Sequence, residues 1–267
     1  MSIPVPSKTG TCLITGASSG IGTEFARQMA ERGYNVTLAA RRIDRLTELA
    51  AEIEDRHGVR AIAVACDVTD SQQRQELIDS IGARGDSIDI LINNAGIGTD
   101  GSFADFAPDA HLPQLEVNVI ALTAITSLVL PQMIEHDSGA ILNVSSTAGF
   151  QPLPRQAVYA ASKAYVTSLS QALSQELKNT GVSATVLCPG PTRTEFFGER
   201  QADLEQDSPG WAWQTAADCA HDGIDAMFKG RRIVIPRAVN RVGVYSAKVS
   251  PTRMTVAVLD KMWPMGK

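Results

Sequence analysis

The stretch TGASSGIG, from Thr15 to Gly22, follows a short apolar run and precedes a segment with helix periodicity. Its glycines, Gly16, Gly20 and Gly22, have the spacing G-x-x-x-G-x-G. This spacing differs from the G-x-G-x-x-G of many dinucleotide-binding turns, and the stretch lacks the lysine of a P-loop. Glycines between a strand and a helix allow a tight turn and a close approach of the backbone to a phosphate, which the helix N-terminus attracts through its free N–H groups and its dipole. The same residues also suit an ordinary loop, so the surrounding pattern has to decide.

Short apolar segments rich in β-branched residues alternate with longer amphipathic segments over the first two-thirds of the chain. Strands that are apolar on both faces and separated by helices indicate a parallel sheet covered on both sides. With right-handed crossovers, this pattern predicts an α/β protein with a doubly wound parallel sheet (Rossmann fold) of about seven strands and helices on both faces. We find no linker and no repeat, so residues 1–267 are expected to form a single domain. The expected strands are Thr11–Thr15, Asn35–Ala39, Ala61–Cys66, Ile88–Asn93, Ala140–Ser145, Ser183–Cys188 and Arg231–Pro236.

Two of the expected helices have well-marked limits. The segment Ile43–His57 has helix periodicity and is followed by Gly58, a residue type that commonly ends helices. A second helix is expected from about Thr215 to Phe228. Ligands of doubly wound sheets bind beyond the carboxyl ends of the strands, which is where the glycine-rich turn lies. Its position therefore favours nucleotide binding over an ordinary loop.

The composition excludes several classes of protein. Of the 267 residues, 44% are hydrophobic and 20% are charged, and the formal net charge is −5. An acidic chain of this kind is not expected to have a general affinity for nucleic acid. No apolar run reaches the roughly 18 residues that span a bilayer, so no membrane span is expected. The start of the chain, MSIPVPSKTG, does not have the pattern of a secretory signal.

The cysteines and histidines show no metal-binding spacing. Neither a C-x-x-C pair nor an H-x-x-x-H pair occurs. Three of the cysteines lie in apolar, strand-like runs, where a free cysteine behaves as a small buried hydrophobe. These features predict a reduced, cytoplasmic protein without a bound metal. The residues concerned are Cys12, Cys66, Cys188 and Cys219, and His57, His111, His136 and His221.

Further motifs accompany the glycine-rich turn in a fixed order. They are NNAG at Asn93–Gly96, Asn118 within LEVNVIAL, NVSS at Asn143–Ser146, YAASK at Tyr159–Lys163 and PGPTRT at Pro189–Thr194. Together with TGASSGIG, these motifs make the chain resemble the short-chain dehydrogenase/reductase family over essentially its whole length. The resemblance implies hydride exchange between a nicotinamide cofactor and an oxygen-bearing carbon.

The resemblance maps an active site onto Asn118, Ser146, Tyr159 and Lys163. Taken alone, a tyrosine four residues before a lysine is a common pair on one helix face. In the family pattern Tyr159 is the general acid, Lys163 and the oxidised nicotinamide lower its pKa, and Lys163 also holds the nicotinamide ribose. Ser146 would hold the substrate oxygen, because the family's serine lies 13 positions before the tyrosine, which excludes Ser145. Asn118 would hold a water that links Lys163 to solvent, or kink its helix, or do both.

The end of the second strand, LAARR, bears on the choice of cofactor. Enzymes that use NAD usually carry an acidic residue there, whereas Ala40 occupies that position here and Arg41 follows. A guanidinium can bind a 2′-phosphate through two charge-assisted hydrogen bonds, so Arg41 favours NADP(H) over NAD(H). Arg42 either assists or is a solvated residue that opens the next helix, and we favour the second interpretation. Ser19 is a departure, because many NADP-preferring relatives carry a basic residue before the middle glycine.

The other expected cofactor contacts follow the family pattern. Asp67 resembles the residue that contacts the adenine, while capping of the next helix better suits Thr69 or Asp70. Asn94 is expected to stabilise the strand ends, and Pro191 to pack on the nicotinamide ring. The expected cofactor-binding residues are Gly16, Ser18, Ser19, Gly20, Ile21, Gly22, Arg41, Arg42, Asp67, Val68, Asn94, Ala95, Gly96, Tyr159, Lys163, Pro189, Gly190, Thr192 and Thr194, of which the two threonines would bind the carboxamide.

Aromatic residues after the last motif suggest an apolar substrate pocket under a mobile lid at about residues 195–213. The expected substrate contacts are Ser146, Phe150, Leu153, Tyr159, Phe196 and Phe197, and Trp211 and Trp213 belong to the same aromatic group. The hypothesis is a hydrophobic ketone, aldehyde or secondary alcohol. The sequence does not choose among 3-oxoacyl thioesters, steroids, retinoids, sugars and xenobiotic ketones.

The basic, amphipathic tail at residues 238–267 could pack on its own domain, form an oligomer contact or touch a membrane surface. A homo-oligomer, dimer or tetramer, is expected. The leading hypothesis for the whole chain is an NADP(H)-dependent carbonyl reductase or alcohol dehydrogenase. The alternatives are a non-catalytic redox sensor that binds NADP(H), which loss of Tyr159 or Lys163 would indicate, and an epimerase or dehydratase, for which the chain is short.

Overall fold

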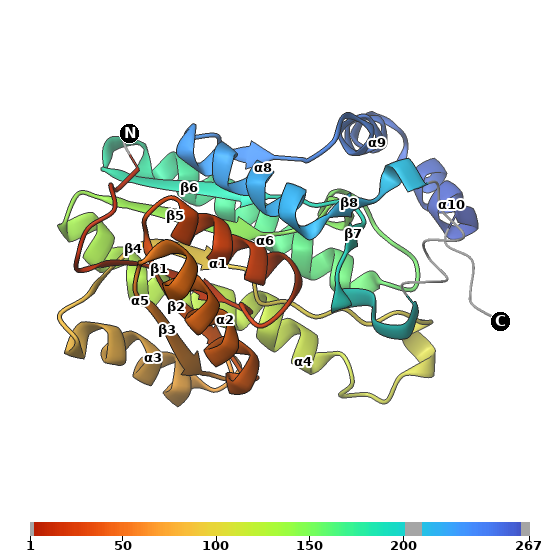
Figure 1. Cartoon of the computed structure of the whole chain (residues 1–267). Coiled ribbons are helices and arrows are strands. Elements are labelled where there is room, and N and C mark those ends of the chain that lie inside the picture. Colours follow the sequence, from red (N-terminus) through yellow and green to blue (C-terminus); the bar gives the residue numbers. More distant parts are fainter. Residues whose placement is uncertain (1–2, 201–209, 263–267) are drawn as a thin grey trace.

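The computed structural model describes residues 3–200 and 210–262, and its centre is a parallel β-sheet (Figure 1). Seven strands are arranged in the order β3-β2-β1-β4-β5-β6-β9, and every neighbouring pair is parallel. This confirms the predicted doubly wound α/β fold. The strands are β1 (Gly10–Thr15), β2 (Asn35–Ala40), β3 (Ala61–Ala65), β4 (Ser87–Asn93), β5 (Gly139–Val144), β6 (Val182–Leu187) and β9 (Ile233–Val234).

Helices cover both faces of the sheet because alternate strand residues are apolar on each side. In β1, Ile14 packs into the cluster with α1 (Gly20–Glu31), α2 (Ile43–His57) and α8 (Ala216–Phe228). Its neighbour Leu13 packs into the opposite cluster, on the side of three other helices. These are α3 (Ser71–Ala83), α5 (Leu122–Glu135) and α6 (Ala157–Glu176).

The strand order reverses between β1 and β4, which are neighbours in the sheet although two strands separate them in the chain. Crossovers to one side of this point build the β3 edge, and crossovers to the other side build the β9 edge. Loops diverge at such a switch point beyond the carboxyl ends of the strands, and a crevice for a ligand forms there. The glycine-rich turn after β1 and the NNAG segment at the end of β4 both lie at this place.

The boundaries of most elements agree with the local sequence signals. Six predicted strands end within one residue of the observed ones. Helix α2 has the predicted limits, and Gly58 ends it in the left-handed conformation with φ 65°. Asp70 caps α3 by accepting the N–H groups of Gln72 and Gln73, as expected. The last strand is shorter than predicted, because Arg231 donates its N–H to Ala226 at the end of α8 instead of joining the sheet.

The longest apolar helical run corrects the statement that no apolar run is long enough to span a bilayer. The run Leu112–Glu135 is long and apolar enough to cross a bilayer by length and composition. It comprises α4 (Leu112–Leu115), the π-helical segment η2 (Glu116–Ala121) and α5. One side of α5, including Ile125 and Val129, packs into the core beneath the sheet. The run is therefore a partly buried part of the fold: one side packs into the core, whereas Ile120 and Ile134 are 47% and 44% exposed.

The segment predicted to form a lid is enclosed by a small second sheet. Strand β7 (Thr192–Arg193) pairs in parallel with β8 (Gln214–Thr215), so the two ends of the segment lie together. Between them the 3₁₀ helices η5 (Glu195–Arg200) and η6 (Gly210–Ala212) frame residues 201–209, which lie outside the described residues. The remaining 3₁₀ helices are η1 (Phe103–Asp105), η3 (Thr147–Phe150) and η4 (Leu177–Asn179).

The tail packs on its own domain through the helices α9 (Ala238–Val249) and α10 (Thr252–Met262), and residues 263–267 lie outside the described part (Figure 1). Val244 of α9 is buried against β6 residues such as Val186. Leu259 of α10 packs against the cluster that contains Leu153 and Tyr159. The first of the three alternatives for the tail is therefore observed.

All four cysteines are free and buried, which agrees with their predicted role as small apolar residues. Cys12, Cys188 and Cys219 have no exposed surface, and Cys66 has 2%. Burial raises the pKa of the Cys66 thiol to about 11 and that of Cys188 to about 12. The thiols are therefore protonated and unreactive at neutral pH.

Candidate active site

The glycine-rich turn is held open by backbone conformations that only glycine adopts freely. Gly16 and Gly20 have φ values of 66° and 58°. Gly22 lies so close to the Gly16 carbonyl and to the Asn94 amide, 2.6 Å from its ideal Cβ position, that no side chain fits there. Asn94 donates from Nδ2 to the carbonyl oxygens of Thr15 and Gly16, at 3.0 and 3.2 Å. The predicted role of Asn94 in stabilising the strand ends is confirmed.

The start of α1 fits the phosphates of a dinucleotide. Its N-cap residue, Ser19, makes no capping hydrogen bond with its side chain, and no acidic residue stands in the first turn. The free N–H groups of this first turn and the positive end of the helix dipole therefore have no acidic side chain of the same turn as a partner. A pyrophosphate could approach there because Gly16 and Gly20 carry no Cβ atoms.

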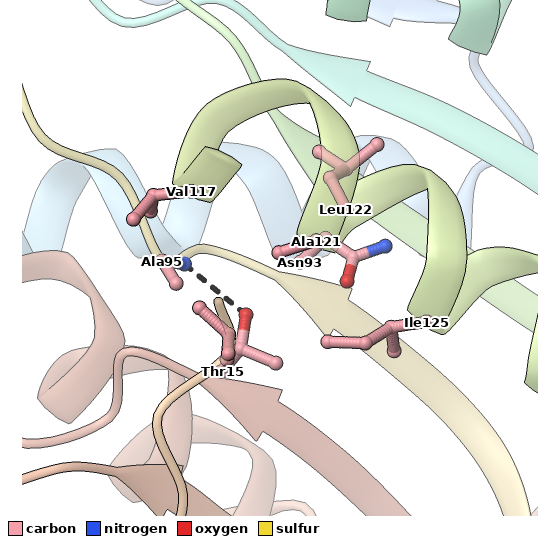
Figure 2. Close-up of a pocket in the computed structure, with 8 residues that line it drawn as sticks. Thr15, Asn93, Ala95, Val117, Ala121, Leu122 and Ile125 are labelled. Carbon is pink, nitrogen blue, oxygen red and sulfur yellow. Dashed lines mark hydrogen bonds between the residues drawn. The ribbon is translucent and has the colours of Figure 1, made fainter. Parts of the chain in front are cut away.

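Two expected cofactor residues, Val68 and Ala95, line a small hollow beside this turn (Figure 2). Ala95 donates its backbone N–H to Thr15 Oγ1 at 3.1 Å, which joins β4 to β1 at the switch point. Asp67 lies just before Val68 and accepts from the Thr69 N–H and hydroxyl group. These hydrogen bonds lower the pKa of the Asp67 carboxyl group, which keeps it ionised. The remaining residues that line the hollow are Asn93, Val117, Ala121, Leu122 and Ile125.

The two arginines that follow β2, Arg41 and Arg42, have different contacts. Arg41 is exposed, and its charge contributes to the low pKa of Asp67. Arg42 reaches back over the glycine-rich turn and donates to the hydroxyl oxygens of Ser18 and Ser19, at 3.1 and 2.7 Å. It also pairs with Glu195 at 2.9 Å. Arg42 is exposed and is the N-cap residue of α2, as the favoured interpretation expected, and its guanidinium also joins three polar groups at the turn.

The catalytic candidates lie together at the carboxyl end of the sheet. Tyr159 and Lys163 are on α6, and Ser146 lies two residues beyond the end of β5, as the N-cap of η3. The Ser146 side chain acts on the Tyr159 hydroxyl group and lowers its pKa. Lys163 is buried, donates to the Val144 carbonyl oxygen at 3.0 Å and has its Nζ 5.8 Å from the centre of the Tyr159 ring. The structure thus brings the three residues to one point, beside the glycine-rich turn.

The pKa values of the tyrosine and the lysine are shifted by burial. Burial raises the pKa of Tyr159 to about 12, and the hydrogen bond with Ser146 only partly opposes this effect. Burial lowers the pKa of Lys163 to about 8. The expectation that Lys163 lowers the tyrosine pKa is therefore not met by the protein alone, because desolvation dominates. Tyr159 holds its proton at neutral pH, as a proton donor must.

Asn118 is locked in place by its neighbours. It lies in the π-helical segment η2 and is almost fully buried. Its Nδ2 donates to the Ile97 carbonyl oxygen at 2.9 Å and to Ser162 Oγ at 3.0 Å, and its Oδ1 accepts from the Ile97 N–H. Helical irregularities of this kind are frequent at functional sites. The predicted distortion of the helix at Asn118 is confirmed, while the water relay stays a prediction.

Gly96 makes room for the catalytic side chains. A Cβ atom there would lie 3.3 Å from Lys163 Nζ and 3.4 Å from Asn118 Oδ1. Gly98 has a similar place, since its Cβ would lie 3.0 Å from Phe196 and 3.5 Å from the Tyr159 ring. The chain after β4 therefore passes directly over the candidate catalytic residues.

Comparison with known proteins agrees with this geometry. The model of the short chain dehydrogenase family matches residues 10–205. The chain belongs to the short-chain dehydrogenase family. It is 36% identical over 245 residues to sulfoacetaldehyde reductase 2 of Chromohalobacter salexigens, a match that covers 90% of this chain and 94% of the relative.

Two solved structures are similar to this short-chain dehydrogenase. One, a short-chain dehydrogenase from Sphingobium yanoikuyae in complex with NADPH, has a TM-score of 0.78 and 33% identity, covering 89% of this chain and 92% of that chain. The other, from Burkholderia phymatum in complex with NAD, has a TM-score of 0.80 and 25% identity, covering 90% and 92%. The protein is an oxidoreductase of this family, and the bound cofactors of both neighbours support a nicotinamide cofactor.

The two threonines of the PGPTRT segment in this short-chain dehydrogenase have different surroundings. Thr192 is buried, donates to the Gly190 carbonyl oxygen at 3.0 Å and accepts from Gln214 Nε2 at 3.1 Å. Thr194 lies against the glycine-rich turn, 3.0 Å from the ideal Cβ position of Gly20. Of the two side chains, Thr194 is thus the one that borders the expected phosphate site. The carbonyl of Pro189 lies 3.5 Å from Ser146 Oγ.

The expected substrate residues are divided between the site and the core. Phe196 packs on the Tyr159 ring with 5.7 Å between ring centres, and Leu153 lies in the same apolar cluster as Tyr159. Phe150 packs under α9, where Lys248 Nζ lies 4.8 Å from its ring centre. The side chain of Phe197 lies outside what the structure describes. Trp213 is buried with 3% of its surface exposed, whereas Trp211 is 60% exposed.

Arg45 and Glu195 are two residues near the cofactor site that the sequence interpretation missed. Arg45 lies three residues after Arg42 on the same side of α2, and its NH1 atom contacts both carboxylate oxygens of Glu195 at 2.8 and 2.9 Å. The R-x-x-R spacing could have indicated the paired guanidinium groups. No local signal indicated Glu195, because 150 residues separate it from Arg45.

The two serines of the NVSS motif give a matched test. Ser145 is buried and donates to the Lys163 carbonyl oxygen at 2.8 Å, so it fixes β5 to α6. We expect Ser146→Ala to lower kcat roughly 10²-fold, as the loss of one oxygen-holding donor does, with little change in Tm. Ser145→Ala should lower the free energy of unfolding by about 1–3 kcal/mol and spare kcat. Steady-state kinetics and thermal unfolding of both variants check this, and reversed effects would reassign the two residues.

Proposed function

We propose that the protein is an NADP(H)-dependent oxidoreductase that exchanges a hydride between the nicotinamide and a carbonyl or secondary alcohol of a hydrophobic small molecule. The observation that carries this proposal is the group of Ser146, Tyr159 and Lys163 beside the glycine-rich turn. The bound cofactor would supply or accept the hydride. The chain would supply proton transfer, orientation and shielding from water.

Tyr159 is proposed to protonate the oxygen of the reduced carbonyl. Its high pKa, about 12, keeps the proton on the hydroxyl group until negative charge develops on the substrate oxygen. Ser146, whose side chain lowers the pKa of Tyr159, would donate to the same oxygen. Lys163 would bind the nicotinamide ribose and restore the charge balance near Tyr159. Asn118, fixed by Ile97 and Ser162, would line the path of the proton to solvent.

The preference for NADP(H) is supported by the cations at the end of β2. Ala40 carries no carboxylate there, and Arg41 and Arg42 lie beside the turn. A 2′-phosphate would find two guanidinium groups within one short segment, whereas the 2′-hydroxyl of NAD(H) would find no acceptor side chain at Ala40. The NADPH complex of the Sphingobium relative supports this choice, and the NAD complex of the Burkholderia relative shows that the fold alone does not make it.

The proposed hydrophobic substrate rests on the surroundings of Tyr159. Phe196, Leu153 and Leu259 provide aromatic and aliphatic surface next to its ring. The segment from η5 to η6 is proposed to act as the lid over this surface, and the reduced, buried cysteines suit a cytoplasmic enzyme. No observation favours the non-catalytic sensor, because the chain retains all four catalytic candidates, Asn118, Ser146, Tyr159 and Lys163.

A carbonyl panel tests the proposed reaction. Purified protein is mixed with NADPH and, one at a time, with aliphatic, aromatic and steroid ketones and aldehydes, and the absorbance of the reduced nicotinamide is followed. We expect loss of NADPH with at least one apolar carbonyl, and faster turnover than with NADH. Inactivity across the whole panel, with NADPH bound, would contradict the proposal and favour the sensor.

The proposed binding of the 2′-phosphate by Arg42 can be tested separately. Replacing Arg42 with Ala removes charge-assisted hydrogen bonds of the kind worth about 1.5–3 kcal/mol, so NADPH affinity should fall roughly 10- to 100-fold. NADH affinity should change by less than about threefold, since NADH carries no 2′-phosphate. Fluorescence titration of both cofactors measures the two constants. Equal losses for NADPH and NADH would show that Arg42 only supports the fold of the turn through Ser18 and Ser19.

A further inference from the structure

Three consecutive residues contact three separate parts of the candidate cofactor site. The Thr194 side chain lies over Gly20 of the glycine-rich turn, and the Phe196 ring packs on Tyr159. Between them, Glu195 pairs with Arg42, the N-cap residue of α2, and with Arg45 in its first turn. We name this segment, residues 194–196, the strap. It links the phosphate side of the site, the end of β2 and the candidate catalytic tyrosine.

The central contact of the strap is an ion pair with two cations. Glu195 Oε2 accepts from Arg42 NH1 at 2.9 Å, and Oε1 accepts from Arg45 NH1 at 2.8 Å. Hydrogen bonds from both guanidinium groups lower the pKa of Glu195, so the carboxylate is charged at neutral pH. Arg42 at the same time donates to Ser18 and Ser19. The carboxylate therefore occupies an anion position directly beside the glycine-rich turn.

A 2′-phosphate would require this same position. Phosphate oxygens and carboxylate oxygens are bound by guanidinium groups in the same bidentate manner. Two anions cannot share the pair Arg42 and Arg45 without strong repulsion, because a phosphate carries close to two negative charges near neutral pH. One anion must therefore leave the arginines before the other can bind them.

We infer that Glu195 is a specificity-determining residue that competes with the 2′-phosphate for Arg42 and Arg45. A cofactor with the phosphate displaces the Glu195 carboxylate and frees the strap, including the Phe196 ring on Tyr159. A cofactor without the phosphate leaves the ion pairs in place. Glu195 thus sets how strongly the site prefers NADP(H), and it links this choice to access at the tyrosine. The inference rests on the proposed NADP(H) preference and adds a residue that limits it.

Two nucleotides isolate the effect of the phosphate. Adenosine 2′,5′-bisphosphate carries the 2′-phosphate and adenosine 5′-monophosphate does not, and neither needs a substrate or turnover. In Glu195→Gln the amide keeps the size of the side chain and loses its charge. Because exposed ion pairs contribute about 0.2–1 kcal/mol each, two lost pairs should raise bisphosphate affinity roughly two- to 30-fold. Monophosphate affinity should stay within about twofold.

Glu52→Gln is the matched control. Glu52 also pairs with an arginine, Arg27, at 2.8 Å, and its replacement changes the net charge by the same amount. Isothermal titration should give wild-type affinities for both nucleotides in this variant. If Glu52→Gln raised bisphosphate affinity as much as Glu195→Gln does, the effect would be one of general charge, and the inference would be overturned.

A double-mutant cycle with Arg45→Ala completes the test. Arg45→Ala should weaken bisphosphate binding, and in its background Glu195→Gln should raise the affinity much less than in the wild type. Unchanged or lower bisphosphate affinity in Glu195→Gln would overturn the inference. The proposed cofactor preference fails separately: it is refuted if the wild-type protein binds the two nucleotides equally well, whatever the variants do.

Discussion

Replacing Tyr159 with Phe should lower kcat by about 10²–10⁴-fold, the usual contribution of a general acid. The variant loses one hydroxyl group and keeps the ring that packs on Phe196 and near Lys163. Cofactor affinity should therefore stay within about twofold, because the phosphate side of the site is unchanged. Steady-state kinetics with the best carbonyl of the panel, and NADPH titration, measure the two quantities.

Tyr165 provides the control on the same helix. Its hydroxyl group lies 3.0 Å from Thr123 Oγ1, and its side chain is 39% exposed. Tyr165→Phe removes the same group about 1.7 turns from Tyr159 and should leave kcat unchanged. Turnover of Tyr159→Phe at the level of Tyr165→Phe would show that another group donates the proton.

Replacing Gly22 with Ala should disrupt the glycine-rich turn. The new methyl group would collide with the Gly16 carbonyl oxygen and the Asn94 side-chain amide. These two groups are hydrogen-bonded to each other at the switch point of the sheet. Such overpacking costs about 1–3 kcal/mol, which lowers Tm by roughly 2–10 °C in a domain of this size. The start of α1 must shift away from β4, so NADPH affinity should fall more than tenfold, equivalent to about 1.4 kcal/mol.

Gly82→Ala is the control for this change. Gly82 lies inside α3, and a Cβ atom there would meet no other atom within 4 Å. Alanine in a helix interior is favoured over glycine by about 0.5–1 kcal/mol, so this variant should be slightly more stable and bind NADPH as the wild type does. If Gly22→Ala bound NADPH normally, the turn would not be the phosphate site.

Local signals in the sequence were sufficient for most of the fold. Helix α2 was predicted with its observed limits, because a periodic apolar stripe and a single terminal glycine, Gly58, define it. The strands of the sheet are apolar runs with sharp polar ends, so their limits differ little from the prediction. Strand β9 was overestimated, since its length is set by contacts of Arg231 with α8 and not by its own residues.

The candidate catalytic residues were predictable for a different reason. Fixed spacings selected Ser146 over Ser145, and the structure gives the two serines the separate neighbours that this choice requires. The tyrosine pKa was not predictable from spacing, because it depends on how completely the fold excludes water around Tyr159. Lys163 was expected to counter this effect, but its Nζ donates to the Val144 carbonyl oxygen.

Long-range electrostatic contacts were outside the reach of the sequence. Nothing near Arg42 indicates that its partner is Glu195, which arrives from the strap after the last strand motif. At Asn118 the sequence indicated a distorted helix, but it did not indicate the hydrogen bonds of the amide to Ile97 in the loop after β4. Such contacts depend on how distant segments meet above the sheet, and that arrangement exists only in the folded chain.

Isotope transfer tests the central claim most directly. The wild-type protein is incubated with NADPH that carries deuterium on the transferable position of the ring, together with a carbonyl from the panel, and the alcohol product is examined by mass spectrometry. We expect one deuterium on the new carbinol carbon, and roughly 100-fold less deuterated alcohol, or lower still, from Tyr159→Phe after the same incubation time. An alcohol without deuterium, or no alcohol while NADPH is consumed, would contradict direct hydride exchange at this site.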